Sequence, residues 1–142
     1  MRTFLKVAAV LMLSFGGYYL LMGASAALSC NQIGEMAQSM DETIDAALAS
    51  QATLQLGIML LIIGLLEGLA GLFGLLGNKR KGFLIACMAL SGVMLIANLV
   101  TVATTEFEWM YVIELALPTM LLAAGIGVFR LGPENQPPRL SR

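Results

Sequence analysis

TLQLGIMLLIIGLLEGLAGLFGLLG occupies residues 53–77, and NKRK follows it at residues 78–81. The first stretch holds a single charged side chain, Glu67, whereas the second holds three basic ones. About 20 apolar residues in a helix cross the hydrocarbon core of a bilayer, and short cytoplasmic loops are enriched in Lys and Arg. Together the two stretches predict a transmembrane helix that ends at a cytoplasmic turn.

Three further apolar runs of similar length lie at residues 4–28, 83–105 and 109–131. The chain is 58% hydrophobic and 12% charged, and a soluble domain carries roughly 25% charged residues. Lipid offers no hydrogen-bond partner to a bare backbone, so each run is expected to be a helix. We expect an all-α membrane protein, a four-transmembrane-helix bundle over residues 1–131 with a cytoplasmic tail at 132–142.

The charged residues predict the orientation of this bundle. All basic residues lie at the N-terminus, in the turn after residue 77, or at and beyond the end of the fourth run: Arg2, Lys6, Lys79, Arg80, Lys81, Arg130, Arg139 and Arg142. The acidic residues between the runs fall in the two opposite connections: Glu35, Asp41, Glu42, Asp45, Glu106 and Glu108. The positive-inside rule then places both termini in the cytoplasm, in a multi-pass protein of the inner or plasma membrane.

The first span has an alternative interpretation. Arg2 and Lys6, the apolar stretch and Ala24-Ser25-Ala26 also resemble a cleavable signal peptide. The apolar run is long for a signal, which favours an uncleaved helix. Cleavage would leave three spans without changing which side each connection faces.

An outer amphipathic helix is expected between spans one and two, at about residues 31–50. Its apolar side chains recur at helical spacing and include Ile33, Met36, Met40 and Ile44. Helices that lie on anionic lipid are normally basic, and this segment is acidic. The helix is therefore interpreted either as a lid on its own bundle or as a docking surface for a partner protein.

Glycines of the second span form a candidate packing face: Gly57, Gly64, Gly68 and Gly71 share a narrow arc. Small residues let helix backbones approach closely in lipid. The face is expected to pack either inside one bundle or against a second copy of the chain.

The interior also holds polar candidates: Glu67, Asn98, Glu114, Tyr18 and Tyr19. Glu67 lies near the middle of its span, where a carboxyl group is expected to be neutral, paired or facing water, with the tyrosines as candidate partners. Asn98 and Glu114 lie at matching depths, which predicts a hydrogen bond between them. Pro118 should leave the carbonyl of Glu114 without its helical donor.

These polar groups allow three functions: interhelical hydrogen bonding, a proton or cation path, or a quinone or lipid pocket. The chain has no His, and no C-x-x-C, phosphate-loop or H-E-x-x-H motif. Nothing in it gives a positive reason to propose an enzyme, a metal site or nucleic-acid binding. No cofactor is predicted, and a bound lipid or quinone stays an alternative.

One segment resembles a known family. GLLEGLAGLFGLLG at residues 64–77, a short basic turn and a third apolar helix are similar to the DoxX-like small four-span membrane proteins. The resemblance implies a membrane subunit linked to quinone redox chemistry, with Glu67 at the matching position.

The leading interpretation is a non-catalytic accessory or structural subunit of a larger membrane assembly. Its expected partners are membrane lipids and other membrane subunits or a second copy of the chain. One alternative is a small proton- or cation-coupled transporter that uses Glu67 and Glu114. The other is the quinone-linked subunit that the resemblance implies.

Overall fold

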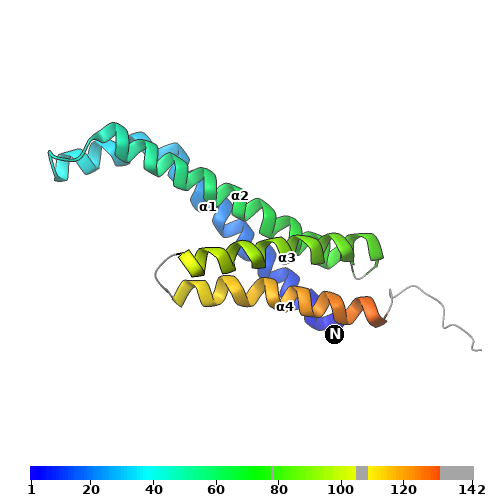
Figure 1. Cartoon of the computed structure of the whole chain (residues 1–142). Helices are drawn as coiled ribbons and strands as arrows, with labels where there is room; N and C mark the ends of the chain where they lie inside the picture. The colour runs from blue at the N-terminus through cyan, green and yellow to red at the C-terminus, as the bar shows by residue number, and fades with distance from the viewer. Residues whose placement is uncertain (78, 105–108, 132–142) are drawn as a thin grey trace, which may run out of the picture. The chain divides into compact units, whose positions relative to one another are not determined.

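A computed structural model of the chain describes residues 1–77, 79–104 and 109–131, with the backbone alone at 109–111. Its helices are α1 (Arg2–Met40), α2 (Ala46–Gly77), α3 (Lys81–Thr104) and α4 (Trp109–Leu131), coloured from blue to orange in Figure 1. Each is long and apolar enough to cross a membrane, which confirms the expected all-α, multi-pass class. The predicted tail at 132–142 and the end of the third span at residue 105 lie outside the described residues.

The chain divides into two compact units. The first, called here the four-helix unit, comprises Met1–Ser14 and Leu66–Arg142, so it contains α3, α4 and one end of both α1 and α2. The second, called here the hairpin unit, is Phe15–Leu65 and consists of the remainder of α1 and α2 with the turn that joins them.

The expected outer helix does not form a separate element. The first ten residues of 31–50 continue α1 as far as Met40, and the last five begin α2 at Ala46. Between the end of the first apolar run and Met40 the chain has no Pro and a single Gly, Gly34, so hydrogen bonding continues past the lipid-crossing length. The break comes where polar side chains compete for the backbone.

Two aspartates stabilise the break between α1 and α2. Asp41 accepts hydrogen bonds at Oδ1 from the amide (2.9 Å) and the hydroxyl (2.7 Å) of Thr43, which forms a local turn. Asp45 accepts a bond from the amide of Ala47 at 2.8 Å and so caps the N-terminus of α2. The Asp41 turn and the Asp45 cap thus separate α1 from α2, and the two helices form an antiparallel hairpin.

Two of the four helices are longer than a helix needs to be to cross a bilayer. α1 has 39 residues and α2 has 32, lengths of about 58 and 48 Å at 1.5 Å per residue. α3 and α4, with 24 and 23 residues, are close to the roughly 30 Å of a hydrocarbon core. The excess length of α1 and α2 relative to the expected spans lies at the end of the hairpin unit that carries the turn between them.

The packed side chains belong to the four-helix unit. α3 and α4 lie side by side (Figure 1), and Leu84, Leu121 and Val128 are among the large side chains that they bury. In the hairpin unit, which is described throughout, every buried residue is a glycine: Gly16, Gly23, Gly34, Gly57 and Gly64. The hairpin therefore exposes all of its larger side chains, at least in part, to lipid, water or another protein.

Candidate functional site

Glu67 is the one buried acidic side chain in the part of the chain that the structure describes. It lies on α2 in the four-helix unit and is 3% exposed. Its Oε2 atom is buried and has no hydrogen-bond partner among the described groups. A buried polar atom without a partner costs about 1–3 kcal/mol in proteins, so a carboxyl group kept in this state calls for a role.

The neighbours of Gly74 show which way this face of α2 points. A Cβ built on Gly74 would meet the Cβ of Ala9, Cδ1 of Leu121 and Sγ of Cys87 at 2.9, 3.2 and 3.4 Å. Glu67 lies seven residues before Gly74 and so shares its face two turns away. This face points into the four-helix unit, toward α1, α3 and α4.

The same counting places one residue of α3 and one of α4 level with Glu67. Seven residues after Cys87 on α3 comes Met94, which is buried, and seven before Leu121 on α4 comes Glu114. The two carboxyl groups that the sequence singled out thus lie at one level of the four-helix unit.

The expected hydrogen bond between Asn98 and Glu114 is present. Asn98 Nδ2 donates to the backbone carbonyl oxygen of Glu114 at 2.8 Å. Pro118 lies four residues after Glu114, inside α4, and has no amide to donate to that carbonyl. Asn98 on α3 therefore supplies the donor that Pro118 withholds, and this bond fixes α3 against α4.

Ser91 continues the polar face of α3. It is fully buried, and its hydroxyl donates to the carbonyl of Cys87 at 2.9 Å. The hydroxyl hydrogen is thus bonded within its own helix, so Ser91 needs no acceptor on a neighbouring helix. Cys87 and Cys30 are both free thiols.

Glycines let α1 and α2 approach closely in the hairpin unit. A Cβ built on Gly64 would lie 2.7 Å from the carbonyl oxygen of Gly16 and 2.7 Å from the amide nitrogen of Leu20. One on Gly57 would lie 2.9 Å from the carbonyl oxygen of Gly23. No side chain fits at these two positions unless the backbones move apart.

In the four-helix unit Gly71 makes the same approach. A Cβ there would lie 2.7 Å from the carbonyl oxygen of Ala9 and from the amide of Leu13. Gly68 differs, because a Cβ at that position would meet nothing within 4 Å. Close contacts thus recur every seven residues along α2 and do not include Gly68.

Sequence reasoning missed the α1 side of this seam. Ala9, Gly16 and Gly23 are also seven residues apart, and they meet Gly71, Gly64 and Gly57 in reverse order. Matching seven-residue spacings of small residues on adjacent antiparallel helices could have revealed the pairing.

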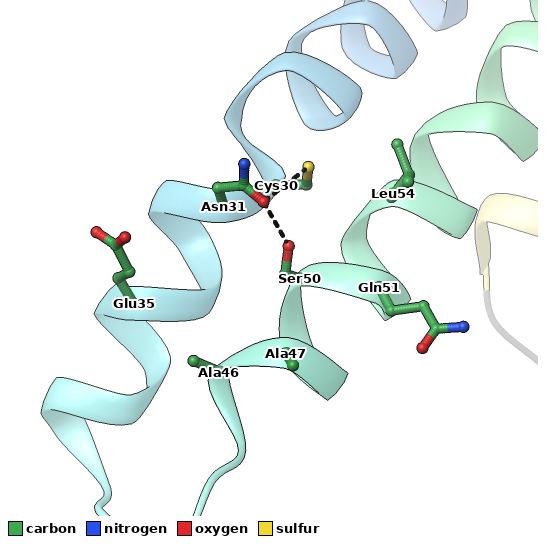
Figure 2. Close-up of a pocket in the computed structure, with 8 residues that line it drawn as sticks. All are labelled: Cys30, Asn31, Glu35, Ala46, Ala47, Ser50, Gln51 and Leu54. Atoms are coloured by element: carbon green, nitrogen blue, oxygen red, sulfur yellow. Dashed lines mark hydrogen bonds between the residues drawn. The ribbon is translucent and has the colours of Figure 1, made fainter.

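A shallow groove of about 510 Å³ lies in the hairpin unit, close to the turn between α1 and α2 (Figure 2). Its lining is Cys30, Asn31, Glu35, Ala46, Ala47, Ser50, Gln51 and Leu54. Figure 2 shows that Asn31 joins its two walls: Ser50 Oγ on α2 donates to Asn31 Oδ1 on α1 at 3.0 Å. Cys30 Sγ donates to the same oxygen at 3.8 Å.

The predicted docking residues lie beside this groove and are exposed. Met36 is 59% and Met40 is 78% exposed on α1, with Ile33 on the same face, and Ile44 is exposed in the turn. On α1, Gly34 faces α2 and packs against Ser50, so the face of Ile33, Met36 and Met40 points elsewhere. The apolar face is therefore not covered by its partner helix.

Tyr18 and Tyr19 belong to the hairpin unit, and their rings make an edge contact with centroids 5.8 Å apart. Glu67 belongs to the other unit, so the expected contact between it and the tyrosines stays a prediction.

A scan against protein-family models found no matching family, and searches of curated proteins and of solved structures found no match.

Proposed function

We propose that the chain is a non-catalytic accessory subunit of a larger membrane assembly. Its four helices anchor it in the bilayer, and the outer end of the hairpin unit docks on another subunit. The separation of basic from acidic connections supports a cell membrane location with both termini in the cytoplasm.

One observation carries this proposal: α1 and α2 continue past the apolar spans and expose apolar side chains there. About 12 residues of α1 and 7 of α2 lie between the predicted spans and the turn, about 18 and 10 Å of helix. Met36, Met40 and Leu48 are 59%, 78% and 66% exposed in these extensions. Burying a side chain of this size is worth about 1.5–3 kcal/mol, so a partner gains considerably by covering them.

The chemistry of the partner follows from the surrounding charges. Glu35, Asp41, Glu42 and Asp45 are all exposed near the apolar residues. Acidic groups around an apolar centre favour a partner surface with an apolar patch and a basic rim. The flexible Met side chains adapt readily to such a patch.

The test is purification in a mild detergent from native membranes, comparing wild type with the Met36→Gln/Met40→Gln double variant. Wild type is expected to retain a partner at fixed stoichiometry, and the double variant to lose it. Gln38→Ala changes an uncharged, exposed position of the same helix turns that lies off the apolar face, and it should retain the partner. A wild-type chain that purifies alone at the same yield would contradict the proposal.

A second candidate function rests on the buried Oε2 of Glu67. An unpartnered carboxyl oxygen level with Glu114 is suited to take up a proton or a small cation, so we infer a proton- or cation-coupled carrier as the alternative. In proteoliposomes this function requires that Glu67→Gln abolish flux while the protein assembles normally. The quinone-linked alternative makes a separate prediction, a purified sample with bound quinone.

A further inference from the structure

A pocket of about 440 Å³ lies at the turn between α2 and α3, within the four-helix unit. Its lining is Phe73, Arg80, Gly82, Phe83 and Ala86. The rings of Phe73 and Phe83 stack with centroids 5.7 Å apart and planes 30° apart. The pocket thus combines an aromatic wall with a single cationic side chain.

The wall and the cation lie at different depths. Phe73 is four residues before the end of α2 at Gly77, about 6 Å along the helix axis, and Phe83 and Ala86 are about 3 and 7.5 Å beyond the start of α3. Arg80 lies in the turn itself and is exposed. In a spanning helix pair this places the aromatic wall at the level of acyl chains and the guanidinium at the level of headgroups.

All charged residues near this turn in the sequence are basic. Lys79 and Lys81 flank Arg80 and are exposed, and the sequence has no Asp or Glu from Gly68 to Thr104. The backbone amides in the first turn of α3 add a partial positive charge to the same corner. Basic residues at a membrane surface attract anionic headgroups, and Arg forms paired hydrogen bonds with phosphate.

We propose that this pocket binds one anionic phospholipid. Arg80 holds the phosphate group, and Phe73 and Phe83 contact the first part of an acyl chain. Binding fixes the turn between α2 and α3 and is independent of whatever the hairpin unit docks on.

Native mass spectrometry of the full chain tests this, with phosphatidylglycerol and phosphatidylcholine of identical acyl chains titrated as probes. One phosphatidylglycerol is expected to bind about 5- to 10-fold more tightly than phosphatidylcholine, the preference of one basic contact. Arg80→Gln should remove most of this preference. Arg130→Gln removes an equal charge at the end of α4 and should leave the preference intact.

Gly82→Leu separates the acyl-chain contact from the charge. A Cβ at Gly82 meets nothing within 4 Å, so the fold accepts a side chain there, and leucine would enter the pocket. Both lipids should then bind more weakly with the basic turn unchanged. Equal affinity of wild type for the two lipids, or equal losses in Arg80→Gln and Arg130→Gln, would overturn the proposal. Displacement of the lipid by millimolar glycerol phosphate would reject the acyl-chain contact.

Discussion

Adding one methyl group at Gly64 should separate α1 from α2. The Cβ of Gly64→Ala would lie 2.7 Å from two backbone atoms of α1, whereas ordinary van der Waals contact begins at 3.4 Å. Both atoms belong to the main chain of a helix and cannot rotate away. The two helices must therefore move apart by about 0.7 Å at this level, which loosens the contacts around it.

The cost follows from this displacement. Overpacking a close contact costs about 1–3 kcal/mol, and better helix propensity of alanine returns at most about 1 kcal/mol. Gly68→Ala is the matched control, because it makes the same change one turn away in open space. That variant should be neutral or up to about 1 kcal/mol more stable than wild type.

Reversible unfolding by SDS in mixed micelles, followed by circular dichroism, measures both free energies of unfolding. Gly64→Ala is expected to unfold at lower SDS than wild type, and Gly68→Ala at equal or higher SDS. If the free energies of unfolding of both variants change in the same direction, the close contacts at seven-residue intervals do not stabilise this hairpin.

Two further predictions concern single hydrogen-bonded groups. Asn98→Ala should destabilise the α3–α4 pair by about 0.6–1.7 kcal/mol. In a double-mutant cycle, Pro118→Ala should remove most of that cost, because the amide of residue 118 then donates to the Glu114 carbonyl. Additive losses of stability in the two variants would contradict this. The hydroxyl and amide bonds from Thr43 hold the pKa of Asp41 below its usual 3.8. They therefore stabilise the turn fully above pH 3.8 and stop doing so as the pH falls below it toward the lowered pKa. Thr43→Val should raise the pKa of Asp41 in a carboxyl NMR titration, and an unchanged titration would refute the role of the hydroxyl.

Hydropathy was sufficient to predict the four helices and some of their ends, but not the ends of α1 and the start of α2. α2 ends at Gly77 and α4 spans Trp109–Leu131, as the apolar runs indicate, because polar residues follow Gly77 and precede Trp109 in the sequence. α1 runs to Met40 because a helix needs only intact backbone hydrogen bonds and no apolar sequence. The helix expected at residues 31–50 followed from apolar residues at helical spacing. Most of those residues are helical, but they belong in part to the end of α1 and in part to the start of α2.

The sequence predicted contacts that depend on the level of two residues along their helices. It did not predict contacts that depend on the alignment of α1 with α2. Asn98 and Glu114 could be paired because both lie at the same level of adjacent antiparallel helices. The partners of Gly57, Gly64 and Gly71 depend on how α1 slides along α2, so they can be found only by comparing the seven-residue spacings of the two helices with each other. Gly68 shares their arc but is not at a close approach, which only the position of the partner decides.

Site-specific photo-crosslinking in native membranes tests the accessory-subunit proposal most directly. A photoreactive residue at Met40 or Leu48 lies on the exposed apolar surface, and one at Gln38 lies on the opposite face of α1. The proposal predicts one discrete adduct of the same mass from Met40 and Leu48, and a much weaker one from Gln38. No protein adduct from either apolar position would contradict it.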